Sequence, residues 1–362
     1  MLKAKCWAVK EKSVHADARL ERLLLCVNCY IFAFSQFNGP KRPSASPTQT
    51  LDRLFLPIRF QHPSLPMKRA HKFDTIGFGA TCYVTTTDDP AVVRKGYQVW
   101  EDGRLWLNRE HEYYTSGEED VQREATIYNI LGDHDQILKF LGLEEIGPGV
   151  HSLRLERAPL NNVRSYIKQH PDEPPALEDR LYMAIQAARG VAYIHSKGVQ
   201  HCDLCCRNLL LFEGLRVKLG DFGASLIDGR GLKETNCEEA AYELPLRGRE
   251  FYTRPGRKRD IFALGSAIYE ITTWKRPYAG LEDEEIESRY AQDLFPPLEG
   301  NVAGAVISKC WGEGYETADE VALDLGQCFE RLEEETRLSL PSDIETNSSA
   351  DGKSSTQLAI KA

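Results

Sequence analysis

Two segments set the chemistry of this chain: His201-Cys202-Asp203-Leu204-Cys205-Cys206-Arg207-Asn208 and Leu219-Gly220-Asp221-Phe222-Gly223. Asn208 lies five residues after Asp203, and Asp221 lies eighteen residues after Asp203. Mg²⁺ prefers hard oxygen ligands, usually keeps several waters and bridges substrate phosphates, so a carboxylate and an amide oxygen suit it. The residue types and their spacing therefore indicate a site for phosphoryl transfer.

The residues between Asn208 and Asp221 predict a β-hairpin. Residues 209–212 are apolar, Glu213-Gly214 is a turn signal, and residues 215–219 alternate between apolar and basic side chains. Such a hairpin would return the chain so that Asn208 and Asp221 face each other. The alternative is a buried hairpin with solvated aspartates at its ends, and the motifs elsewhere in the chain argue against it.

The remaining pattern predicts strands in the first part of the chain and helices in the second. A helix is expected at 118–131, because Val121, Glu124 and Tyr128 recur at helical spacing. Around it, strands are expected near residues 75–78, 83–84, 91–95, 137–141 and 152–155. Later helices are expected at 177–196, with Gly198 at its C-terminal end, and at 260–273. Strands followed by helices indicate an α+β fold with two unlike lobes.

These motifs resemble the glycine loop, catalytic loop and metal motif of the protein kinase superfamily, in the style of a divergent fungal-like member. The resemblance covers roughly residues 71–338. It implies a bilobal fold, with a small β-rich N-lobe that carries one key helix (71–156) and a larger, mostly helical C-lobe (157–338). It also implies ATP and Mg²⁺ as cofactors and a protein hydroxyl as acceptor. Serine or threonine is favoured, and tyrosine stays open.

The resemblance assigns roles to the residues of the two opening segments. Asp203 is expected to orient the attacking hydroxyl and accept its proton, while Asn208 and Asp221 hold Mg²⁺. Arg207 is expected to balance charge on the transferring phosphoryl group. Asp260 is expected to accept hydrogen bonds from the backbone of the catalytic loop, since a buried carboxylate must be paired. His201 and Phe222 are expected to pack beside Tyr128 and Phe140.

The same resemblance places the nucleotide in the N-lobe. Lys95 is expected to hold the α- and β-phosphates and to pair with Glu124 on the helix. Arg94 is adjacent, but neighbouring side chains point to opposite faces of a strand, so only one can serve. The other expected nucleotide contacts are Gly77, Phe78, Gly79, Val84, Val93, Leu155, Glu156, Ala158 and Leu210.

The chain departs from the family pattern in three places. Cys82 stands at the third glycine of the glycine loop, and Cys202 replaces the arginine that clamps a phosphorylated activation loop. No Ala-Pro-Glu motif follows the metal motif within residues 224–255. Cys202 predicts activity without loop phosphorylation. The departures keep a nucleotide-binding pseudokinase scaffold as an alternative, and an aminoglycoside- or choline-kinase type of small-molecule phosphotransferase as another, which Asp221-Phe222-Gly223 argues against.

Three cysteines crowd the expected catalytic base, and two interpretations follow. Arg207 could lower the pKa of a thiol at 202, 205 or 206 and make it reactive. The favoured interpretation is small buried thiols that fill core space. Cys26-x-x-Cys29 and Cys202-x-x-Cys205 have zinc spacing, but joining them would deform the catalytic loop, so zinc is not expected.

Composition limits the partners and the location. The net charge is −9, yet residues 1–72 carry thirteen Lys/Arg against four Asp/Glu, which leaves an acidic body of −18. This argues against general nucleic-acid binding. No apolar run is long enough for a transmembrane segment. We expect a basic, Pro-rich, disordered arm at 1–70, a disordered tail at 339–362, a cytoplasmic location with a nuclear one left open, and a monomer acting on protein substrates.

Overall fold

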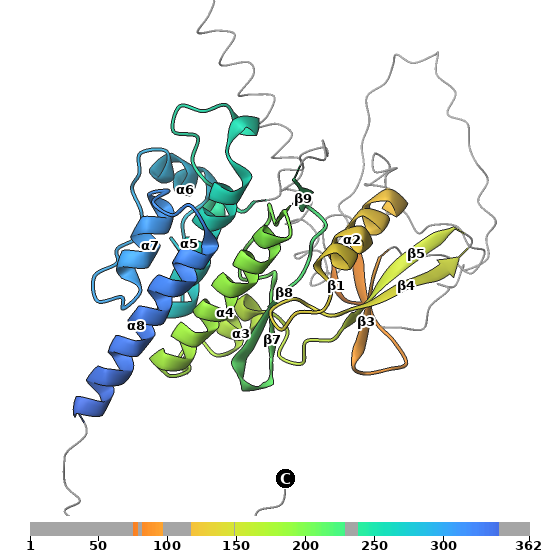
Figure 1. Cartoon of the computed structure of the whole chain (residues 1–362), viewed down its shortest axis with the longest axis horizontal. Helices are drawn as coiled ribbons and strands as arrows, with labels where there is room; N and C mark the ends of the chain where they lie inside the picture. Colours follow the sequence, from red (N-terminus) through yellow and green to blue (C-terminus); the bar gives the residue numbers. More distant parts are fainter. Residues whose placement is uncertain (1–74, 79–81, 97–116, 148, 229–237, 340–362) are drawn as a thin grey trace, which may run out of the picture. The chain divides into compact units, whose positions relative to one another are not determined.

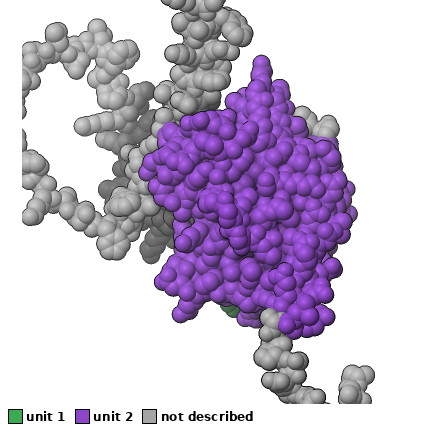
Figure 2. Space-filling view, turned by 90° about the vertical axis from the view of Figure 1, so that its left-hand side faces the viewer, with its two compact units in different colours: residues 1–125, 141–157 green, residues 126–140, 158–362 purple. Residues whose placement is uncertain are grey.

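The computed structural model describes residues 75–78, 82–96, 117–147, 149–228 and 238–339 (Figure 1). The chain divides into two compact units. Figure 2 shows the surface of unit 2. Unit 1 comprises residues 1–125 and 141–157, and unit 2 comprises residues 126–140 and 158–362. The expected arm, the expected tail and Gly79 lie outside the described residues.

Unit 1 is built on a five-stranded sheet with the order β1-β2-β3-β5-β4. Its strands are β1 (Thr75–Phe78), β2 (Tyr83–Thr86), β3 (Val92–Gly96), β4 (Phe140–Gly147) and β5 (Val150–Glu156). Helix α2 (Gly117–Leu131) follows β3 in the chain, as the helical spacing predicts. The β2–β3 turn is fixed by Asp89, whose side chain accepts a 2.9 Å hydrogen bond from the Ala91 amide.

The strand expected at residues 137–141 is wrong in its first half. Ile137 forms only an isolated parallel bridge with Leu219, and the strand proper begins at Phe140. The Leu138 amide donates to the Leu219 carbonyl at 2.7 Å, so this apolar segment packs on the end of a different sheet. The apolar, β-prone residues at 137 and 138 correctly predict burial, but which strand this segment pairs with is set by its tertiary packing.

Unit 2 is mostly helical. Its helices are α3 (Val163–Gln169), α4 (Leu177–Ser196), α5 (Gly256–Thr273), α6 (Asp283–Tyr290), α7 (Gly304–Trp311) and α8 (Ala318–Ser339). Two small antiparallel ladders complete it: β6 (Val199–Gln200) with β9 (Leu226–Ile227), and β7 (Leu209–Phe212) with β8 (Arg216–Leu219). Sheet-rich and helix-rich units confirm the α+β fold expected from the sequence.

Helix α4 positions the β7–β8 hairpin. Gly190 leaves room for it, because a Cβ at that position would lie 2.5 Å from Leu219 Cδ1. The buried Gln186 side chain accepts a 3.0 Å hydrogen bond from the Val217 amide and donates to the Leu215 carbonyl at 3.2 Å. The helix ends where predicted, and Gly198 follows it with φ +70°, a conformation that glycine adopts without strain.

No helix in the described ranges is both long enough and apolar enough to cross a membrane.

Candidate active site

The loop that carries Asp203 is anchored in the core of unit 2 by Asp260. This carboxylate accepts hydrogen bonds from the amides of His201 at 2.7 Å and Cys202 at 2.9 Å. It also contacts His195 Nε2 at 2.9 Å. Burial raises the pKa of Asp260, but the hydrogen bond and charge of His195, together with His201 and the Cys202 amide, outweigh it, and the net pKa is lowered. Asp260 therefore stays ionised and accepts from the loop backbone, as expected from its position in the sequence.

Aromatic packing holds the loop next to the metal motif. The His201 and Phe222 ring centroids are 5.3 Å apart, and Phe222 meets Tyr128 edge-on at 5.1 Å. Tyr128 stacks on Phe140 at 5.3 Å, and the His201 Nε2 lies 3.1 Å from the Gly220 carbonyl oxygen. The predicted packing of His201 and Phe222 is confirmed, and it ties residues 201 and 222 into one rigid cluster.

The β7–β8 hairpin brings Asn208 and Asp221 to the same end of a ladder. Leu209 pairs with Leu219, and the Gly220 amide donates to the Asn208 carbonyl at 3.0 Å. The hairpin prediction is confirmed, although Leu215 joins the turn rather than the strand. Asp221 has φ +62°, a left-handed conformation that is uncommon for a residue other than glycine.

Asn208 links this ladder to Asp203. Its Nδ2 donates to the Asp203 carbonyl at 2.7 Å and to Asp203 Oδ2 at 3.1 Å. The other carboxylate atom, Asp203 Oδ1, is buried and has no hydrogen-bond partner among the described residues. Burial and then the charge of Asp221 raise the pKa of Asp203 well above its usual range. A buried acceptor without a donor is costly, so Oδ1 is left available to a ligand, an ion or a water.

The donor set fits Mg²⁺. Asn208 donates two hydrogen bonds to Asp203, and both come from its Nδ2. The amide oxygen of Asn208 is therefore left as an acceptor. Asp221 supplies a carboxylate close enough to raise the pKa of Asp203 by charge repulsion. A carboxylate and an amide oxygen, those of Asp221 and Asn208, are hard ligands of the kind that Mg²⁺ takes, and a bound cation would relieve the repulsion between Asp221 and Asp203.

In unit 1, Lys95 and Glu124 form a buried ion pair. Lys95 Nζ lies 2.9 Å from Glu124 Oε1 and 2.8 Å from Oε2, and the two side chains are 11% and 3% exposed. The adjacent Arg94 instead makes a two-pronged contact with Glu144, at 2.8 and 2.7 Å. The predicted pair is therefore present, and the neighbouring arginine serves the opposite face of the strand. Their part in nucleotide binding stays a prediction.

Most apolar residues predicted to contact the base share the sheet face of Lys95. Val84 is the cross-strand neighbour of Lys95, and Val93 is that of Leu155. Because alternate residues of a strand share a face, these four side chains line one side of the sheet. Gly77 pairs with Val84 on that side, and a Cβ there would lie 3.6 Å from Val84 Cβ.

The remaining predicted nucleotide contacts lie at the ends of strands of this sheet or in unit 2. Phe78 ends β1 and Glu156 ends β5. Ala158 is the first residue of the 158–362 segment of unit 2. Leu210, which is half-buried, lies on β7 in the same segment. Gly79 lies outside the described residues. The nucleotide roles of all these positions remain predictions.

The reactive-thiol hypothesis is wrong. Cys202, Cys205 and Cys206 are at most 1% exposed. Burial, the largest cause in each case, raises the pKa of all three thiols, and the opposing charge of Arg207 at Cys205 does not overcome it. The thiolate, which is the reactive form, is thus disfavoured, and the cysteines fill core space. Among the described residues, no group of three or more His, Cys, Asp or Glu side chains is arranged to hold a metal ion.

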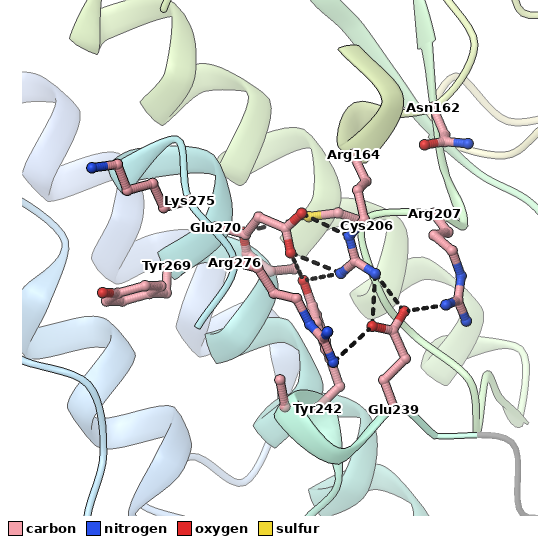
Figure 3. A network of polar contacts seen from close by, with 12 residues as sticks. Asn162, Arg164, Cys206, Arg207, Glu239, Tyr242, Tyr269, Glu270, Lys275 and Arg276 are labelled. Atoms are coloured by element: carbon pink, nitrogen blue, oxygen red, sulfur yellow. Dashed lines mark hydrogen bonds and ion pairs between the residues drawn. The ribbon is translucent and has the colours of Figure 1, made fainter. Parts of the chain in front are cut away.

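Arg207 has a partner that the sequence did not indicate. Its Nη1 lies 2.8 Å from Glu239 Oε1, while half of the Arg207 side chain (51%) stays exposed. Glu239 lies in the segment that lacks an Ala-Pro-Glu motif. Figure 3 shows this carboxylate at the centre of a polar network in unit 2. The adjacent acids Glu238 and Glu239 were the only signal in the sequence, and they do not reveal their partners.

Comparison with known proteins gives a consistent result. A family model described as protein tyrosine and serine/threonine kinase matches residues 108–317, more than half of the chain. The chain is 30% identical over 192 residues to the Arabidopsis thaliana serine/threonine/tyrosine-protein kinase HT1, covering 50% of this chain and 47% of that protein. It is 28% identical over 228 residues to the A. thaliana mitogen-activated protein kinase kinase kinase 20, covering 59% and 62%.

A yeast protein kinase is also similar to this chain. The serine/threonine-protein kinase BCK1/SLK1/SSP31 of Saccharomyces cerevisiae is 31% identical over 184 residues, which covers 48% of this chain and 12% of that protein. The chain spans less than two thirds of the length of each of these three curated relatives.

Proposed function

Because this chain belongs to the protein tyrosine and serine/threonine kinase family, we propose that it transfers the γ-phosphoryl group of ATP to a protein hydroxyl. Serine and threonine are the proposed acceptors, with tyrosine as the alternative, because the names of similar proteins include both types. Mg²⁺ is the proposed metal cofactor.

The observation that carries the proposal is the state of Asp203. Its Oδ1 is buried without a hydrogen-bond donor, while Oδ2 is held by Asn208 at 3.1 Å. A substrate hydroxyl that donates to Oδ1 would satisfy the buried oxygen and be oriented for attack. Its proton would pass to Asp203 as the oxygen bonds to the γ-phosphorus, and the bond from that phosphorus to the departing ADP would break.

The other site residues support the same chemistry. Asn208 and Asp221 would hold Mg²⁺, which when bound neutralises charge on the phosphates. Lys95, fixed by Glu124, would bind the phosphates of the nucleotide, and Val84, Val93 and Leu155 on the same sheet face would contact the base. Arg207, half exposed, would balance charge on the transferring group. Positioning and electrostatic stabilisation are then the main sources of rate enhancement.

Two alternatives predict different outcomes. A pseudokinase scaffold would bind nucleotide without transfer, and Cys82, Cys202 and the missing Ala-Pro-Glu motif are the departures that favour it. A small-molecule phosphotransferase would label an aminoglycoside or choline and leave peptides unlabelled. We propose in addition that the protein acts as a monomer in the cytoplasm, with the nucleus as the alternative location.

The test is transfer from radiolabelled ATP to a mixed peptide library that contains Ser, Thr and Tyr acceptors. Wild type should label peptides in the presence of Mg²⁺. Asp203→Asn, which keeps the size of the side chain, should reduce labelling by about a thousandfold, at the level expected for a lost general base. Nucleotide binding without labelling by wild type would contradict the proposal and favour the scaffold.

A further inference from the structure

The carboxylate of Glu239 lies among three arginines of unit 2 (Figure 3). Both of its oxygens are 2.6 Å from Arg164 Nη1, Oε1 is 2.8 Å from Arg207 Nη1, and Oε2 is 3.5 Å from Arg276 Nη2. Arg164 belongs to α3, Arg207 to the catalytic loop, and Arg276 to the segment after α5. One side chain therefore joins three parts of the unit.

A second layer of contacts makes this junction rigid. Arg164, 7% exposed, gives two 2.8 Å hydrogen bonds to the two oxygens of Glu270 on α5. It also donates to the Tyr242 hydroxyl at 3.0 Å, and that hydroxyl donates to Glu270. Buried charges are tolerated only when they are paired in good geometry, so the removal of one member is expected to disturb the others.

The charge balance shows what Glu239 contributes. Arg164, Arg207 and Arg276 are balanced by Glu239, Glu270 and Asp283, which pairs with Arg276 at 3.4 Å, so the cluster is neutral and gains one positive charge without the Glu239 carboxylate. Burial alone would raise the pKa of Glu239, but Arg164, Arg207 and Arg276 lower it overall. The carboxylate is therefore ionised at neutral pH.

We propose that Glu239 is a positioning residue for phosphoryl transfer: its fixed negative charge holds the Arg207 guanidinium in place on the catalytic loop and fastens residues 239–242 to α3 and α5, so that no added phosphate is needed. This inference rests on the kinase activity proposed above. A phosphorylated side chain orders a loop by pairing with arginines, and Glu239 makes the same type of contact with an unmodified carboxylate.

The pairing orients Arg207 rather than covering it. The contact with Glu239 uses Nη1, whereas a guanidinium has five N–H donors, and about half of the side chain remains exposed. A phosphoryl group could therefore still be contacted by the other donors. If Glu239 instead withheld Arg207 from the reaction, removing its charge would raise turnover, which is the opposite outcome.

The test compares three variants of the full chain after complete dephosphorylation. Glu239→Gln removes the charge at nearly constant size, and Glu239→Asp keeps the charge on a shorter side chain. Glu313→Gln is the matched control, because Glu313 also accepts from two arginines, Arg247 at 2.6 Å and Arg249 at 2.7 Å, and within the described ranges the hydrogen bonds of these two arginines go to segments other than the catalytic loop. For each variant, kcat and the KM for ATP are measured below the melting transition.

We expect dephosphorylated wild type to keep its kcat, and Glu239→Gln to lose about ten- to a hundredfold in kcat with the KM for ATP within about twofold. Glu239→Asp should lose several-fold, and Glu313→Gln should match wild type. If Glu239→Gln does not fold, Glu239→Asp decides the question alone.

The inference is overturned by an unchanged or raised kcat in Glu239→Gln or, where that variant is unfolded, in Glu239→Asp. It is overturned equally by loss of turnover on dephosphorylation of wild type. In both cases untreated wild type is an active kinase, so the proposed function stands. A wild type without any phosphoryl transfer rejects the proposed function itself, and this inference with it.

Discussion

Replacing Asp260 tests whether one buried carboxylate sets the shape of the catalytic loop. Asp260→Ala removes the acceptor of the His201 and Cys202 amides and of His195 Nε2, in a site that is 1% exposed. Each buried donor that loses its partner costs about 1–3 kcal/mol, and breaking a buried charged network costs about 3–5 kcal/mol. We therefore expect a loss of about 4 kcal/mol in the free energy of unfolding.

The loss should be visible in both stability and rate. At about 2–4 °C per kcal/mol for a unit of this size, the melting temperature should fall by about 8–16 °C. Cys202 has φ +61°, so a loop freed from Asp260 is expected to relax away from this conformation and to move Asp203. A displacement of about 1 Å can cost about a hundredfold in kcat.

The assay is urea unfolding combined with kcat measured at low temperature, where Asp260→Ala is still folded. Asp324→Ala is the control, because Asp324 is one third exposed, pairs with half-exposed Lys309 and accepts from the hydroxyl of buried Tyr315, so its loss should cost clearly less, about 1–2 kcal/mol. The folded-state pKa of Asp260 is lowered from its ordinary 3.8, so its contribution is present above that pH and is lost as the pH falls through the lowered pKa. An Asp260→Ala variant within about 1 kcal/mol of wild type at pH 7 would refute this reasoning.

Three further predictions concern the Lys95–Glu124 pair, the buried thiols of the catalytic loop and the Glu313 carboxylate. Lys95→Met leaves Glu124 buried without its lysine, so urea unfolding should show a loss of about 3 kcal/mol in the free energy of unfolding. The additional change Glu124→Leu should restore part of this loss, and additive effects in the double variant would contradict the coupling. The thiols within residues 202–206 should resist maleimide labelling at pH 7 in the folded protein and react after urea unfolding, and peroxide should leave turnover unchanged, whereas rapid labelling of the folded state would contradict their burial. Hydrogen bonds from Arg249 and then Arg247 lower the pKa of Glu313 from 4.5 to about 2. Glu313→Gln should therefore lower the free energy of unfolding by about 1–2 kcal/mol above pH 4.5, and by progressively less as the pH falls toward 2. Thermal melts that show a constant difference between variant and wild type over this pH range would contradict that linkage.

Local sequence signals predicted the elements whose boundaries are fixed by local chemistry. Helix α4 ends where Gly198 permits a left-handed residue, and the β7–β8 hairpin turns at Gly214, which has φ +69°. Alternation along β3 correctly separated Lys95 from Arg94, because a strand sends neighbouring side chains to opposite faces. In these cases the residue itself carries the constraint.

Features that depend on distant partners could not be predicted from local signals; those that were predicted, such as the Lys95–Glu124 pair and the Asp260 contacts, came from the family resemblance. Ile137 reads as a strand residue, but its ladder partner is Leu219, in another sheet. The partners of Glu239 lie at positions 164, 207 and 276, and nothing in the residues around Glu239 names them. The interpretation of the catalytic-loop thiols as buried core residues is confirmed. Their burial depends on packing against α5, where Cys206 Sγ contacts the Ala267 carbonyl at 3.8 Å.

The most direct test of the account is a crystal structure of the full chain with a non-hydrolysable ATP analogue and Mn²⁺, which replaces Mg²⁺ and scatters anomalously. We predict an anomalous peak about 2 Å from an Asp221 carboxylate oxygen and from the Asn208 amide oxygen, with the phosphates of the analogue as further ligands. Nucleotide bound with its metal away from both side chains, or no nucleotide bound at all, would contradict the claim that these residues form the site of phosphoryl transfer.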